Sequence, residues 1–83
     1  MIYTVKVCFE SRENMEGVLI VQSVISYDQN GRELQDYQNM VGNEYFGDTA
    51  ENDAVAAIAV ALGISPNQIA VEDTEFVPTP WDR

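Results

Sequence analysis

A chain of 83 residues has room for one domain with a modest core, and its 46% hydrophobic content is too high for a disordered segment. Its 14 acidic residues against four basic ones give a net charge of −10, which excludes electrostatic attraction to nucleic acid or to an anionic membrane. Because the chain has no histidine, it cannot build the Ser-His or Cys-His pairs of common hydrolases.

The first half of the chain reads as three strands. Segment 3–9 alternates apolar and polar residues, which predicts a strand with one apolar face. After a polar loop, segment 18–27 is rich in β-branched residues and begins apolar on both faces, which predicts a central strand. The turn 28–31 (Asp-Gln-Asn-Gly) predicts a hairpin of type I′, because Asn-Gly tolerates positive φ. A calcium loop fits these residues less well, because its glycine is the sixth residue of the loop and here it would be the fourth. Segment 32–40 is mostly polar and predicts a third strand with one wet face, or alternatively a short amphipathic helix.

A helix and a last strand complete the predicted domain. Residues 42–47 are expected to form a connection in which Tyr45 and Phe46 either staple the loop to the core or project as anchors. Asp48 or Thr49, with Glu51, predicts a capped helix start before an apolar body over 54–62, and Gly63 predicts its end. A final strand is expected over 69–77, followed by an extended tail, 78–83, that contains Trp81 and two prolines.

These elements predict an α+β fold in the order β-β-β-α-β, an antiparallel sheet of three to four strands with one helix packed on a face. A single domain over residues 1–77 is expected, with 78–83 as its tail. With one cysteine, Cys8, no internal disulfide can form, which favours a reducing, cytoplasmic setting. We expect no signal peptide, because the chain runs from Met1 straight into a strand pattern, and no membrane span, because the longest apolar run has nine residues (54–62).

The acidic residues fall into three groups along the chain, and we take them as candidate partner-binding residues. Carboxylates spread over one face can compete with nucleic acid for the Lys/Arg groove of a nucleic-acid-binding protein. The alternative is that these acidic residues only form a solvated surface and cap the helix. The groups are Glu10, Glu13 and Glu16 in the first loop, Asp48, Glu51 and Asp53 at the helix start, and Glu72, Asp73 and Glu75 on the last strand.

The apolar helix supplies a second candidate surface. Residues 54–62 include no polar side chain, and a helix that is apolar all round is normally buried all round. With Val55, Ile58 and Leu62 toward the sheet, Ala56 and Val60 would face outward as a self-association surface, unless the alanines are present only as good helix formers.

The length, the acidity, the missing catalytic residues and the β-β-β-α-β layout resemble those of small acidic inhibitor proteins encoded by bacteriophages, the anti-CRISPR proteins above all. The resemblance covers the whole chain in size, charge and element order, and it rests on no sequence motif. It implies a protein that occupies the basic surface of a nucleic-acid-binding complex, in the host cytoplasm if phage-encoded. The residues themselves offer no catalytic pair, metal loop or phosphate loop, so we expect no enzyme activity, metal or cofactor. The alternatives are a structural module that forms a homodimer through the alanine-rich helix, and an accessory subunit docked by strand addition to a sheet edge.

Overall fold

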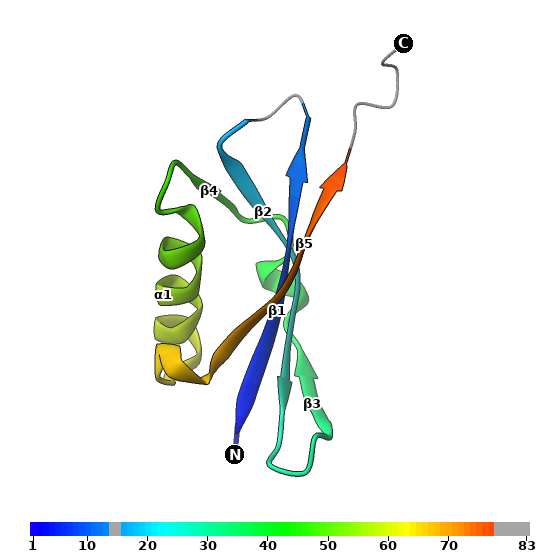
Figure 1. The fold of residues 1–83 in the computed structure, drawn as a ribbon. Helices are drawn as coiled ribbons and strands as arrows, with labels where there is room; N and C mark the ends of the chain where they lie inside the picture. Colours follow the sequence, from blue (N-terminus) through cyan, green and yellow to red (C-terminus); the bar gives the residue numbers. More distant parts are fainter. Residues whose placement is uncertain (14–15, 78–83) are drawn as a thin grey trace.

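The computed structural model describes residues 1–13 and 16–77, so the predicted tail 78–83 with Trp81 lies outside the described residues. One helix packs on one sheet in this part of the chain (Figure 1). In chain order the elements are β1 (Thr4–Arg12), β2 (Val18–Tyr27), β3 (Glu33–Asp36), the 3₁₀ turn η1 (Gln38–Met40), β4 (Glu44–Phe46), α1 (Ala50–Leu62), the 3₁₀ turn η2 (Pro66–Gln68) and β5 (Ile69–Val77).

The strands form a mixed sheet in the order β3-β2-β1-β5, and β4 also pairs with β2. β2 is antiparallel to β1, β3 and β4, whereas β5 runs parallel to β1. The predicted α+β layout is therefore confirmed, and β2 is central as expected. The expectation of an antiparallel sheet does not hold at β5.

The direction of β5 follows from the helix that precedes it. α1 has 13 residues and spans about 20 Å, roughly the length of six strand residues. It carries the chain back along the sheet from the end of β4 (Figure 1). β5 therefore begins where β1 begins, with Ile69 paired to Val5, and has to run in the same direction.

The core lies between α1 and one face of the sheet. Val5, Val7 and Phe9 of β1 are fully buried there, as their alternation with polar residues predicted. Along α1 the buried residues are spaced to face the sheet, and the half-buried Leu62 packs against the same cluster. They are Ala50, Ala54, Ile58 and Ala59.

The helix begins and ends at the predicted residues, but its N-terminus lacks the predicted side-chain cap. Gly63 follows α1 with φ of 69° in the left-handed region, and its N–H donates to the last-turn carbonyls of α1. Thr49 occupies the N-cap position with φ −102° and ψ 13°, outside the extended region that aims a cap side chain at the helix N–H groups. Its hydroxyl instead donates to Asp53 Oδ2 at 3.0 Å. The predicted side-chain cap is therefore wrong.

The hairpin between β2 and β3 is present, but its turn is not of type I′. Gly31 is at φ 83°, while Asn30 does not have positive φ, so the turn uses one left-handed residue instead of two. The Gly31 N–H donates to the Asp28 carbonyl at 3.0 Å. Asp28 Oδ1 accepts from the N–H groups of Asn30 and Arg32, both at 2.9 Å, which stabilises this alternative.

The predicted third strand is split. β3 covers Glu33–Asp36, all exposed, and the chain then turns through η1, whose Met40 is buried in the core. The predicted connection after it contains a short strand, β4, which sequence reasoning missed. Of its two aromatic residues, Tyr45 packs against the core and Phe46 is 62% exposed, so one staples and the other projects.

Candidate functional site

The face of the sheet opposite α1 is open, and we call it the open face. Side chains on a strand alternate between faces and cross-strand partners share one, so the register decides which residues lie there. Because Val5, Val7 and Phe9 face the helix, the intervening Lys6, Cys8 and Glu10 face away from it. Their partners on β5 are Ala70, Asp73 and Glu75.

Two of the three predicted acidic groups meet on this face. Glu10 of β1 is paired with Glu75 of β5, and on its other side with Ile20 of β2. Ile20 is in turn paired with Glu44 of β4. Three carboxylates therefore cross the sheet at one level, and Asp73 follows at the next level, opposite Cys8.

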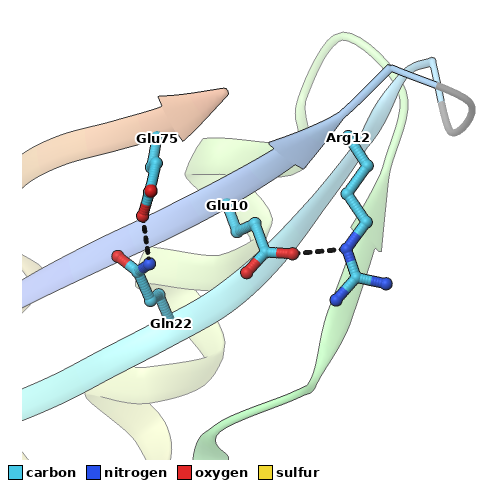
Figure 2. Close-up of polar contacts among 4 residues, drawn as sticks. All are labelled: Glu10, Arg12, Gln22 and Glu75. Atoms are coloured by element: carbon cyan, nitrogen blue, oxygen red, sulfur yellow. Dashed lines mark hydrogen bonds and ion pairs between the residues drawn. The ribbon is translucent and has the colours of Figure 1, made fainter. Parts of the chain in front are cut away.

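Two polar contacts organise these carboxylates (Figure 2). Gln22 Nε2 donates to Glu75 Oε1, and Arg12 Nε pairs with Glu10 Oε2. Figure 2 shows the four side chains together on one side of the sheet, from three neighbouring strands. Glu10 is thus neutralised within the chain, while the exposed Glu75 keeps its charge and is only oriented by a neutral amide.

The helix-start acids lie at the same end of the molecule. The start of α1 and the ends of β1 and β5 all lie in the upper part of Figure 1, away from the N-terminus. A cavity of about 250 Å³ there has Asp48 and Glu51 on one wall and Ser11, Gly17 and Val18 on another. We call this region the acidic end and define it by Glu10, Glu13, Glu16, Glu44, Asp48, Glu51, Asp53 and Glu75.

The opposite end of the open face is closer to neutral. Lys6 lies over the ring of Tyr27, with Nζ 5.0 Å from the ring centroid, a cation–π contact. Arg32 follows the hairpin turn, and Glu33 and Asp36 are paired with Tyr27 and Ile25. Among the described residues, Arg12 is the one basic side chain at the acidic end, so the net charge of the chain is concentrated at one pole.

Glu72 lies outside the acidic end, whereas Asp53 belongs to it and is hydrogen-bonded within the chain. Glu72 falls where the β1–β5 register shifts, between the partners of Val7 and Cys8, and is exposed without joining either row. The predicted group 72–75 therefore divides, with Asp73 and Glu75 on the open face. Asp53 is held by Thr49 on the helix surface.

Glu44 and Gln22 are the open-face residues that sequence reasoning missed. Glu44 depends on β4, and Gln22 depends on the register shift between Cys8 and Phe9, where Ser23 pairs with Cys8 and Val21 pairs with Phe9. The one available signal was the alternation Glu44-Tyr45-Phe46, which was too short to separate from a loop.

The outer face of α1 is arranged as predicted. Ala56 and Ala57 are exposed, and Val60 is 82% exposed, while Ile58 between them is buried. The prediction that Val55 and Leu62 face the sheet holds in part, because both are half-buried. Alanines at 50, 54 and 59 are buried beside Ile58 and complete the sheet-facing stripe.

The remaining candidate sites among the described residues would be a metal-ligand cluster and a second cavity. No group of three or more Cys, Asp or Glu side chains is placed to bind a metal ion within residues 1–13 and 16–77. A second cavity, of about 320 Å³, lies between α1 and the η1–β4 segment and is lined by Val21, Ile58 and Met40 with Asn39, Asn43 and Tyr45. No described helix is long and apolar enough to cross a membrane.

Comparison with known proteins provides no relative. No family model, no curated protein and no solved structure matches this chain. The candidate site therefore has to be interpreted from its own geometry.

Proposed function

We propose that this protein is a non-enzymatic acidic binding protein that occupies the basic surface of a nucleic-acid-binding protein or complex and so inhibits it. The carrying observation is the acidic end, where carboxylates from segments distant in sequence, among them Glu10, Glu51 and Glu75, lie at one pole with Arg12 already paired. Such a pole attracts Lys/Arg surfaces, speeds association and orients the encounter. Lys/Arg surfaces are the ones that bind the phosphates of DNA and RNA.

The biological setting is part of the same proposal. A small acidic chain of this layout would act as anti-CRISPR-like phage inhibitors do, by covering a groove in the host cytoplasm. Binding of this type is electrostatic and should weaken as salt is added. Nucleic acid should displace the inhibitor, because both compete for the same cations.

The experiment is a pull-down of the tagged protein from bacterial lysate, washed at low and at high salt. We expect a nucleic-acid-binding protein that elutes with salt and that added DNA or RNA displaces. Glu44→Lys with Glu75→Lys, at the acidic end, should weaken its binding by about 10- to 100-fold. Glu33→Lys with Asp36→Lys is the matched control, because it changes the net charge equally on the same face at the other end. Equal losses in both variants, or a partner that nucleic acid does not displace, would contradict the proposal.

A second candidate function rests on a different observation, the 82% exposure of Val60 on the outer face of α1. A valine beside exposed alanines lets another helix approach closely, so the chain could act as a homodimeric assembly module. Sedimentation equilibrium at micromolar concentrations checks this: the wild type should be a dimer, and Ala56→Glu or Val60→Glu should be monomers. A wild type that is monomeric at high micromolar concentration would exclude it.

A further inference from the structure

The two edges of the sheet are built differently. On the β2 side the edge is divided between β3, with four residues, and β4, with three. Between them the backbone of Val21 and Val24 is bonded to Asn43, Gly42 and Tyr37 at 2.8 to 2.9 Å. Short strands and turns of this kind protect an edge from further pairing.

The other edge is β5, which has nine residues. Within the described residues, β1 is the only strand that pairs with it (Figure 1). Residues 72–76 are exposed, whereas Ile69 and Val71, earlier in the strand, are partly buried against the core. A strand bonded on one side presents a row of backbone N–H and C=O groups on the other, which is a template for an added strand.

The side chains of β5 differ between its two faces. Asp73 and Glu75 lie on the open face, as partners of Cys8 and Glu10. Thr74 and Phe76 lie on the helix side, as partners of Phe9 and Ser11, and Phe76 is 62% exposed. An incoming strand would therefore meet carboxylates on one face and an aromatic ring on the other.

The charges of β5 disfavour a second copy of the same strand as the occupant. A two-fold antiparallel pair centred on Thr74 sets Asp73 directly opposite Glu75, and a pair centred on Asp73 or on Glu75 sets that carboxylate opposite its own copy. Like charges directly opposite each other destabilise a strand pair. A segment with lysine or arginine opposite Asp73 and Glu75 is instead stabilised, because opposite charges directly across a strand pair attract.

From this we infer that β5 is a docking edge for an extended segment of a partner protein in which Lys or Arg alternates with apolar residues. The inference rests on the proposed function and names how the basic partner is held: backbone hydrogen bonds to the edge of β5, cations against Asp73 and Glu75, and apolar side chains beside Phe76.

The test uses a synthetic peptide, acetyl-Val-Lys-Val-Lys-Thr-Lys-Val-amide, and two versions N-methylated at either the odd or the even positions. In a strand, alternate N–H groups point to the same edge, so strand addition requires only one of the two sets. We expect the parent peptide to bind and to slow hydrogen exchange of β5 amides, one N-methylated version to lose binding, and the other to retain it. If the parent fails to bind, or both versions bind as the parent does, strand addition is wrong.

A charge exchange completes the test. Asp73→Lys with Glu75→Lys should weaken binding of the lysine peptide by about tenfold or more and create binding of a peptide with Glu at the same places. The control is Glu33→Lys with Asp36→Lys, which should leave the lysine peptide bound. Binding that depends on charge but not on N-methylation would leave the proposed function standing and overturn the docking edge. If only one N-methylated version loses binding, and the pull-down recovers no nucleic-acid-binding partner, the docking edge stands and the proposed function is overturned.

Discussion

Shortening Ile58 to alanine should remove much of the stability of this domain. Ile58 is 2% exposed, belongs to the core cluster with Val7 and Phe9, and forms part of the wall of the 320 Å³ cavity. Substitutions of this kind cost about 2–5 kcal/mol in transfer free energy and added cavity, and we expect about 3 kcal/mol here. This is a large part of the free energy of unfolding of an 83-residue chain, which is about 4–12 kcal/mol. At about 4–8 °C per kcal/mol for a chain of this size, the midpoint of thermal unfolding should fall by about 12–24 °C.

The matched control is Val60→Ala, two positions along the same helix. Val60 is 82% exposed, so its loss removes few contacts, and the higher helix propensity of alanine offsets them. Its free energy of unfolding should stay within about 0.5 kcal/mol of the wild type. Urea unfolding followed by circular dichroism measures both, with an unchanged m value showing that the unfolded states are comparable. Similar losses in the two variants would refute the assigned orientation of α1, and a Val60 loss that grows with protein concentration would instead indicate self-association.

Three further predictions concern the turns and the net charge. Gly31→Ala should lower the free energy of unfolding by about 1–2 kcal/mol, because Gly31 is at φ 83°, where alanine is strained. Its control in urea unfolding is Gln29→Ala in the same exposed turn, which should change the free energy of unfolding little. Ser65→Ala should cost about 1 kcal/mol in the same assay, because Ser65 and Gln68 form a capping box at η2; a change below 0.3 kcal/mol would show that the box contributes nothing. Raising NaCl from 50 to 500 mM should increase the free energy of unfolding by about 1 kcal/mol, because it screens the net charge of −10; a decrease would mean that attractive ion pairs outweigh the repulsion.

Sequence reasoning placed most elements of the fold, because local signals marked them. Val5, Val7 and Phe9 alternate cleanly, and Gly63 is followed closely by a proline, so the first strand and the end of the helix were readable. β4 was missed because three residues carry too little periodicity, and its pairing with β2 supplies the stability that its sequence does not. The turn at Gly31 was assigned to the wrong type, because the carboxylate of Asp28 favours a turn with a single left-handed residue.

By itself, the amino-acid sequence determined that this chain is acidic and of the α+β class, with a sheet rich in β-branched residues and an apolar helix, because hydrophobic period and composition are local properties. Only the tertiary structure decided that β5 is a parallel edge strand, since that depends on where α1 returns the chain. It also decided that Glu10, Glu44 and Glu75 cross the sheet at one level and that Arg12 neutralises one of them. Strand register sets which side chains share a face, and register is a relation between segments that no single segment encodes.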